Sequence, residues 1–195
     1  LGKGFNTINI NDNKLEVGAS ILDINLSNYA LRKNIEGFEF YSGIPGSIGG
    51  AVKMNAGCYG TETVDVIKSI EICDNFGQKK TITKDKLNLK YRSSNLNKTD
   101  IVTKAIFNFN YGNKNLIKDK INEIKNKRLK SQPIKNKTSG STFKNPKNHH
   151  AAKLIEEAGC KGTNYGDAYV SDKHANFLIN RGSASATDIE NLGKR

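Results

Sequence analysis

One stretch decides the interpretation of this chain: Gly43-Ile44-Pro45-Gly46-Ser47-Ile48-Gly49-Gly50-Ala51. Glycine lets backbone N–H groups approach an anion closely and adopt positive φ angles. The stretch is neither a Walker A loop, because it lacks the Gly-Lys-Ser/Thr end, nor a G-x-G-x-x-G fingerprint. A tight turn would explain one or two glycines. The loop continues through Met54-Asn55-Ala56-Gly57-Cys58-Tyr59-Gly60, which favours a surface that lies against a ligand. We expect these glycines to prevent a regular helix over 43–60.

Apolar spacing predicts the elements around this loop. In the first half, a strand is predicted over 15–18, followed by a helix marked by Leu22, Leu26, Tyr29 and Ala30. A hairpin is predicted around Asn75-Phe76-Gly77, with strands at 70–72 and 81–83. The last predicted strand of this half has a core face formed by Ile101, Thr103, Ala105, Phe107 and Phe109. The second half contains three predicted helices. The first covers 115–129 and is ended by Gln132-Pro133, and the second covers 151–158 and is stopped by Gly159. The third begins at a capping box formed by Thr187 and Glu190.

Composition limits the class of protein. The 195 residues carry a formal net charge of +12, but the lysines are scattered, and a solvated basic surface is preferred over a polyanion-binding one. Cys58, Cys73 and Cys160 form no C-x-x-C pair, which argues against a disulfide framework or a zinc site. The chain has no run of 18 apolar residues and no signal-peptide pattern, so we expect a cytoplasmic protein. Because it lacks an initiator Met, we expect it to begin downstream of its gene's start.

The glycine-rich loop and its continuation resemble the signature of the UDP-N-acetylenolpyruvoylglucosamine reductases, also called UDP-N-acetylmuramate dehydrogenases. The family pattern is close to G-I-P-G-x-x-G-G-A followed by M-N-A-G-x-Y-G, and in the family this region packs against the pyrophosphate and isoalloxazine of FAD. The resemblance therefore implies FAD contacts by Ile44, Pro45, Gly46, Ser47, Gly49, Gly50, Asn55 and Gly57.

A catalytic arginine is implied by Leu89-Lys90-Tyr91-Arg92-Ser93-Ser94, which resembles the family's Y-R-x-S segment. Taken alone, the segment would be interpreted as a surface Arg next to a half-buried Tyr. A guanidinium suits a substrate carboxylate and an enolate-like oxygen, because it stays charged and donates two parallel hydrogen bonds. The resemblance implies that Arg92 takes this role.

A catalytic proton donor is implied by Gly140-Ser141-Thr142-Phe143-Lys144-Asn145-Pro146, which resembles the family's G-S-x-F-x-N-P. A serine hydroxyl is a weak acid and donates only to a strongly basic centre, such as a carbanion formed by hydride addition. No nearby Asp/His pairing indicates a hydrolase triad. The alternative is a turn serine after Gly140. The resemblance implies that Ser141 is the proton donor.

Further segments follow in the family's order. Arg128 with Gln132-Pro133 resembles R-x-x-x-Q-P, and the stretch from Ser171 to Asn180 resembles S-x-K-H-A-N-F-x-x-N. We interpret His174 as a structural polar residue. The adjacent pair His149-His150 is a poor metal site, and no metal is expected. The resemblance extends over nearly the whole chain.

The resemblance implies an α+β fold in two parts. Residues 1–130 would be the C-terminal portion of a vanillyl-alcohol-oxidase-type FAD-binding domain, and residues 131–195 a truncated substrate-binding domain. Complete members carry an upstream G-x-G-S-N loop and a later catalytic Glu, and we expect this chain to lack both. Leu1 to Asn6 is accordingly predicted to be the strand that follows the missing loop.

The implied reaction starts with reduction of FAD by NADPH. UDP-N-acetylenolpyruvoylglucosamine then displaces the nicotinamide, and hydride passes to the β-carbon of its enolpyruvyl group. Arg92 and the missing Glu stabilise the carbanionic α-carbon, and Ser141 protonates it to give UDP-N-acetylmuramate for peptidoglycan. Two alternatives stay open: a different FAD-dependent oxidoreductase with the same domain, or an inactive or partial remnant. We expect a monomer with no nucleic-acid or membrane partner; steep salt-dependent DNA binding would contradict this.

Overall fold

The computed structural model describes residues 2–195 and divides into two compact units, Leu1–Lys125 and Asn126–Arg195. The division falls within the long helix α5 (Lys114–Ser131). Each unit has its own cluster of buried apolar side chains. Within residues 2–195, no helix combines the length and the apolar character needed to cross a lipid bilayer.

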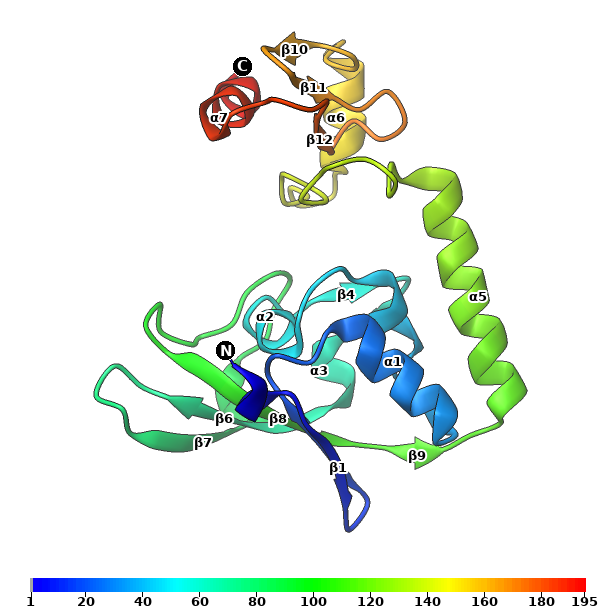
Figure 1. The fold of residues 1–195 in the computed structure, drawn as a ribbon, viewed down its shortest axis with the longest axis vertical. Coiled ribbons are helices and arrows are strands. Elements are labelled where there is room, and N and C mark those ends of the chain that lie inside the picture. Colours follow the sequence, from blue (N-terminus) through cyan, green and yellow to red (C-terminus); the bar gives the residue numbers. More distant parts are fainter. Residues whose placement is uncertain (1) are drawn as a thin grey trace. The chain divides into compact units, whose positions relative to one another are not determined.

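The first unit is built on a five-stranded antiparallel sheet (Figure 1). Its strands lie in the order β1 (Ile8–Asn11), β2 (Lys14–Gly18), β8 (Ile101–Asn108), β6 (Ile67–Cys73) and β7 (Lys79–Thr83). The predicted first strand and the predicted hairpin are confirmed. Asp74 sets the hairpin turn, because its Oδ1 accepts hydrogen bonds of 2.9 Å from the backbone N–H groups of Phe76 and Gln78.

Short helices and two-residue ribbons complete this unit. The helices are η1 (Lys3–Phe5) and η2 (Glu39–Gly43), both of the 3-10 type, α1 (Asp23–Arg32), α2 (Ile48–Lys53), α3 (Thr63–Val66), α4 (Lys84–Leu87) and the first part of α5. The ribbons pair β3 (Ile35–Glu36) with β9 (Asn110–Tyr111) and β4 (Gly57–Cys58) with β5 (Thr61–Glu62). The helices predicted near residues 22–30 and 115–129 are confirmed as α1 and α5.

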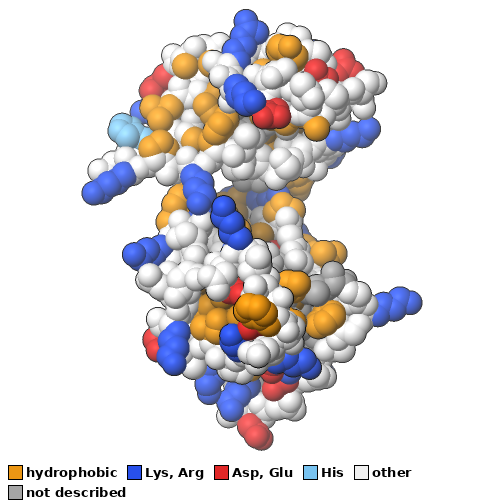
Figure 2. All heavy atoms as spheres, turned by 90° about the vertical axis from the view of Figure 1, so that its left-hand side faces the viewer, with side chains coloured by type: hydrophobic (Ala, Val, Ile, Leu, Met, Phe, Trp, Pro, Cys, Tyr) orange, Lys and Arg blue, Asp and Glu red, His pale blue; other side chains and the backbone are white. Residues whose placement is uncertain are grey.

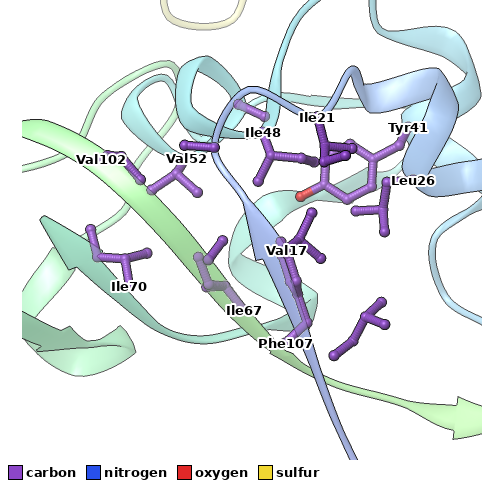
Figure 3. Close-up of a cluster of buried hydrophobic side chains, with 14 of the residues drawn as sticks. Val17, Ile21, Leu26, Tyr41, Ile48, Val52, Ile67, Ile70, Val102 and Phe107 are labelled. Atoms are coloured by element: carbon purple, nitrogen blue, oxygen red, sulfur yellow. The ribbon is translucent and has the colours of Figure 1, made fainter. Parts of the chain in front are cut away.

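The core of the first unit lies between the sheet and the helices α1, α2 and η2 (Figure 3). Phe107 of β8 meets the rings of Phe38 and Tyr41 edge-on, with centroid separations of 5.5 and 6.2 Å. All three rings are at most 1% exposed. Burial of such side chains contributes about 1.5–3 kcal/mol each, so this cluster holds the glycine-rich segment against the sheet.

The second unit contains a small antiparallel sheet and two helices. The elements are α6 (Ala151–Glu157), β10 (Asn164–Tyr165), β11 (Ala168–Val170), β12 (Leu178–Asn180) and α7 (Ala186–Lys194). The predicted helix over 151–158 is confirmed, and Gly159 follows it with a φ of +71°, a conformation that favours glycine after a helix. Leu192 of α7 packs with Val170 and Leu178 of the sheet.

The expectation that no regular helix would form over 43–60 is wrong, because α2 occupies Ile48–Lys53. A Cβ atom at Gly49 would lie 3.1 Å from Ala19 Cβ, so the missing side chain permits close packing of the helix on the strand end. Val52 and Ile48 are fully buried on the same element. Tertiary packing thus outweighs the helix-propensity cost of two glycines, about 1 kcal/mol each.

The predicted core face of β8 is correct only in its second half. Ala105 and Phe107 are fully buried, but Ile101 is 51% exposed and Val102 only 6%. A bulge explains the difference, because Val102 pairs with Ile72 and the next pairing skips Thr103. One extra residue in a strand reverses which side chains face the core.

Two terminal predictions are also wrong. The residue at the N-cap of α7 is Ser185, whose hydroxyl accepts a 3.1 Å hydrogen bond from the N–H of Asp188, so the capping box lies two residues before Thr187. Residues 3–5 form η1 rather than a strand, and the first strand starts at Ile8. Leu1 lies outside the described residues. Both errors arise from local hydrogen bonding that the apolar pattern does not encode.

Basic side chains are dispersed rather than gathered on the face drawn in Figure 2, with acidic side chains among them. On the sheet, Lys104 is bracketed by Glu16 and Glu71, with N–O distances of 3.4 and 3.2 Å. Exposed pairs of this kind contribute little stability, about 0–1 kcal/mol.

Candidate functional site

Backbone hydrogen bonds hold the glycine-rich loop against the segment between β2 and α1. The N–H of Gly49 donates to Ala19 O at 2.9 Å, and the N–H of Asp23 donates to Gly46 O at 3.0 Å. These bonds use the inner edge of the loop. The position of the loop is therefore set by the chain itself before any ligand binds.

The outer surface of the loop carries little side-chain bulk. Pro45, Gly46 and Gly50 are exposed, while Ile44 and Ser47 are half-buried. A planar ring system or a pyrophosphate can approach backbone atoms closely at such glycines. The residues present therefore fit a group with the shape and charge of FAD.

A buried carboxyl group lies under the loop. Asp23 is 0% exposed, and a Cβ atom at Gly46 would lie 2.9 Å from its Oδ2. Within the described residues neither carboxyl oxygen has a hydrogen-bond partner. Burial raises the pKa of the Asp23 carboxyl to about 7. The sequence pattern did not identify this residue, although an acid between Leu22 and Ile24 is an unusual placement in an apolar stretch.

Arg92 is joined to the segment that follows α2. Its Nη1 donates to Asn55 O at 3.1 Å, and its Nη2 donates to Gly57 O at 2.7 Å. Arg92 itself has a φ of +50°, which is uncommon for a residue with a side chain. The structure thus brings Arg92 of one motif into contact with Asn55 and Gly57 of another.

Asn55 is the centre of this contact. Its side chain is fully buried, with Oδ1 accepting from Val64 N at 2.9 Å and Nδ2 donating to Glu62 Oε2 at 2.8 Å and Lys90 O at 3.3 Å. These bonds tie α3, β5 and the Arg92 segment to one amide. Asn55 has a φ of +41°, which Asn tolerates better than most residues with side chains.

Glu62 completes the arrangement and was not identified by the motifs. Its Oε1 lies 3.5 Å from Arg92 Nη1, while Oε2 accepts the hydrogen bond from Asn55. The two side chains of the ion pair are 29% and 34% exposed. The available signal was an acidic residue two positions after Gly60, at the end of the glycine-rich stretch.

The end of α2 holds the segment around Arg92. Lys53 Nζ donates to Leu96 O at 2.6 Å and to Asn97 O at 2.8 Å. Ser94 Oγ donates to Lys53 O at 2.8 Å in return. The segment lacks strand or long-helix structure, so these contacts replace regular secondary structure as the means of placing Arg92.

Ser141 lies in the second unit, on a segment anchored by Asn176. Asn176 is buried, and its amide accepts from Phe143 N at 2.9 Å and donates to Phe143 O at 2.8 Å. Thr142 N donates to Asn176 O at 2.8 Å, and Ser141 forms a backbone bridge with Phe177. Ser141 is exposed on this anchored segment. The Ser171–Asn180 motif therefore acts as the support of the Ser141 motif.

His174 lies beside this support. Its ring meets the ring of Phe177 edge-on at 4.7 Å, and its Nδ1 accepts a 3.3 Å hydrogen bond from Asn176 N. Burial lowers the pKa of His174. No group of three or more His, Cys, Asp or Glu residues suited to a metal ion occurs among residues 2–195.

Family models match both parts of the chain. Residues 1–83 match the model of the FAD binding domain, and residues 132–195 match that of the UDP-N-acetylenolpyruvoylglucosamine reductase C-terminal domain. The UDP-N-acetylenolpyruvoylglucosamine reductase of Rickettsia conorii is 47% identical over 193 residues, which are 99% of this chain and 65% of that protein. The protein of the same name from Rickettsia typhi is 48% identical over the same shares. The chain thus spans 65% of the length of these curated relatives.

A solved structure gives the same assignment. The crystal structure of UDP-N-acetylenolpyruvylglucosamine reductase from Thermus caldophilus matches with a TM-score of 0.90 at 36% sequence identity, over 100% of this chain and 71% of that one. The expected α+β class is confirmed. Because the sequence relatives, both family models and this structure agree along the chain, the protein belongs to the UDP-N-acetylenolpyruvoylglucosamine reductase family.

Proposed function

We propose that this chain forms part of a FAD-dependent enzyme that uses NADPH to reduce UDP-N-acetylenolpyruvoylglucosamine to UDP-N-acetylmuramate, a precursor of peptidoglycan. The observation that supports it best is the docking of Arg92 on the carbonyls of Asn55 and Gly57. It joins the residue assigned to the substrate to the loop assigned to the flavin. In this proposal residues 1–130 hold the cofactor and residues 131–195 belong to the substrate-binding domain.

FAD would be held by the outer surface of the glycine-rich loop. The residues assigned to this contact are Ile44, Pro45, Gly46, Ser47, Gly49, Gly50, Asn55 and Gly57. The inner sides of Gly46 and Gly49 are already packed against Asp23 and Ala19, so a ligand would approach from the exposed side. Asn55 is fully buried and its amide bonds other protein groups, so it would act on the cofactor by holding the loop in place. When bound, FAD supplies the hydride chemistry that no amino-acid side chain offers.

Arg92 would bind and orient the substrate carboxylate. A guanidinium keeps its positive charge at physiological pH, and that of Arg92 is held in one orientation by its hydrogen bonds to two carbonyls. Its positive charge would stabilise negative charge as it develops next to the carboxylate, at the α-carbon of the enolpyruvyl group.

Ser141 would deliver the proton that completes the reaction. Its segment is fixed through Phe143 and Asn176, so the exposed hydroxyl is carried on an ordered support. A hydroxyl donates readily only to a strongly basic carbon, which restricts its action to the step after hydride addition.

The same proposal places the protein in the cytoplasm, as a monomer. The substrate and NADPH are soluble anionic nucleotides, which suit a protein with a net charge of +12. The three widely spaced cysteines suit a reducing compartment.

A titration of the 195-residue chain with FAD tests the proposal. Saturable quenching of flavin fluorescence is expected. Addition of the enolpyruvyl substrate should then perturb the flavin absorbance, whereas UDP-N-acetylglucosamine, which lacks the enolpyruvyl group, should perturb it much less. NADPH should bleach the flavin. A folded chain that does not bind FAD would favour an inactive or partial remnant over a working reductase, and FAD binding without any response to the substrate would indicate an oxidoreductase of other specificity.

A further inference from the structure

Glu62 is the acidic residue that lies against the Arg92 guanidinium. Its Oε1 is 3.5 Å from Arg92 Nη1, and the same Nη1 donates to Asn55 O at 3.1 Å. The other oxygen of Glu62 is held by the buried amide of Asn55 at 2.8 Å. One carboxylate oxygen of Glu62 is therefore held by a buried amide, and the other faces the Arg92 guanidinium.

Packing also limits the movement of Glu62. A Cβ atom at Gly57 would lie 2.6 Å from Glu62 Cγ, so the glycine permits the side chain to cross the ribbon β4–β5 closely. The backbone N–H of Glu62 donates to Asp65 Oδ2 at 2.8 Å, which caps α3. The Glu62 carboxylate thus has few accessible positions, and its charge stays beside Arg92.

We propose that Glu62 is a positioning residue for Arg92. The carboxylate orients the guanidinium on the Asn55–Gly57 backbone through charge, while Asn55 orients the carboxylate. The inference rests on the proposed function, in which Arg92 meets the substrate carboxylate. It predicts that Glu62 affects substrate reduction only through Arg92.

One substitution can separate the effect of the Glu62 charge from the effect of its side-chain shape. Glu62→Gln keeps the size of the side chain and a carbonyl oxygen for the Asn55 amide, but it removes the negative charge beside Arg92. The contact is a 3.5 Å ion pair between half-buried side chains, so its loss should make the guanidinium more mobile while the fold is retained. Glu71→Gln is the matched control, because Glu71 also pairs with a cation and is 36% exposed, but it contacts Lys104 on the sheet.

The first experiment needs no turnover. In the ¹⁵N-labelled chain, the Arg92 Nε–Hε signal is identified by its loss in Arg92→Lys. Glu62→Gln is expected to raise its hydrogen-exchange rate by about two- to fivefold, the size expected for loss of a half-exposed ion pair, whereas Glu71→Gln leaves it unchanged. An unchanged Arg92 signal in a folded Glu62→Gln variant would overturn the proposal. If that variant does not fold, Glu62→Asp serves instead, because it keeps the charge but shortens the reach and should give an intermediate rate.

The second experiment separates this inference from the proposed function. In the FAD-loaded chain, Glu62→Gln should slow flavin reoxidation by the substrate and leave flavin reduction by NADPH unchanged. The double variant Glu62→Gln/Arg92→Ala should be no slower than Arg92→Ala. Additive effects would contradict the positioning role. If Arg92→Ala itself does not slow substrate reduction, the role that the proposed function gives to Arg92 is wrong. The exchange rate of the Arg92 Nε–Hε signal still decides whether Glu62 orients Arg92.

Discussion

Arg92 Nη2 donates a 2.7 Å hydrogen bond to the backbone carbonyl of Gly57, a residue 35 positions earlier in the chain. The bond anchors a segment without long regular structure to the end of the glycine-rich stretch. Arg92 reaches the two carbonyls with two separate nitrogens of a rigid planar fork, a geometry that the single Nζ of a lysine does not reproduce.

Replacement of Arg92 by Ala should lower the free energy of unfolding by about 2 kcal/mol, since two carbonyls lose a charged donor. Urea denaturation measures this change. Arg32→Ala is the control, because Arg32 lies on α1 over the Tyr29 ring and contacts no loop carbonyl in the described contacts. Equal losses in both variants would show that the contact with Asn55 and Gly57 does not stabilise the fold.

The two adjacent glycines of α2 should respond in opposite directions. Gly49→Ala should destabilise the protein by about 1–2 kcal/mol, because the new Cβ would lie 3.1 Å from Ala19 Cβ. Gly50→Ala should stabilise it by about 0.5–1 kcal/mol, because its nearest atom, Ser47 Oγ, is 3.8 Å away and alanine favours a helix. Thermal unfolding of the pair distinguishes packing from propensity; a shift of the same sign in both would contradict the role given to Ala19.

Asp23 should make the protein less stable as the pH rises. The carboxyl has a pKa of about 7 in the folded chain and 3.8 as its reference value. Below pH 3.8 both states are protonated, and between 3.8 and about 7 only the unfolded chain releases the proton, so stability falls through this window and stays lower above it. Asp23→Asn should therefore raise stability at about pH 8, by up to about 4 kcal/mol, and change little near pH 4.

Chemical denaturation across this pH range checks the Asp23 prediction. Asp119→Asn, on the exposed side of α5, is the control for a general change in net charge. A gain for Asp23→Asn that is independent of pH would show that the benefit comes from shape and not from the buried charge.

Asn176 should control the order of the Ser141 segment. Asn176→Ala removes both partners of the Phe143 backbone, which should cost about 2–3 kcal/mol and speed hydrogen exchange at the Phe143 amide. Asn164→Ala is the control, because Asn164 is exposed and its side-chain amide makes a long 3.4 Å contact with Gly166 O. Unchanged exchange at Phe143 in Asn176→Ala would mean that the segment is ordered by other contacts.

Ser141→Ala should separate the two halves of the proposed reaction. Product formation should stop, because no proton reaches the α-carbon, whereas reduction of the flavin by NADPH should continue. Stopped-flow absorbance of the flavin follows its reduction by NADPH, and chromatography of the UDP-sugar follows product formation. Turnover near the normal rate in Ser141→Ala would remove the proton-donor assignment.

Local patterns in the sequence were sufficient for the elements that carry regular apolar spacing. The hairpin around Asn75-Phe76-Gly77 and the helices α1, α5 and α6 follow from residues close together in the chain. The motifs also singled out Arg92 and Asn55, which the fold brings into contact. The hairpin and the helices depend on side-chain period and turn chemistry, which neighbouring residues determine, whereas Arg92 and Asn55 were singled out by the family resemblance.

Tertiary structure alone decided the remaining features. The helix α2 forms against the propensity of its glycines because Gly49 packs on Ala19, and the bulge in β8 depends on its pairing with β6. Likewise, the link from Glu62 to Arg92 and the burial of Asp23 exist only because distant segments meet. Such contacts depend on which residues the completed fold brings within a few ångströms of each other, and a linear pattern carries no information on that distance.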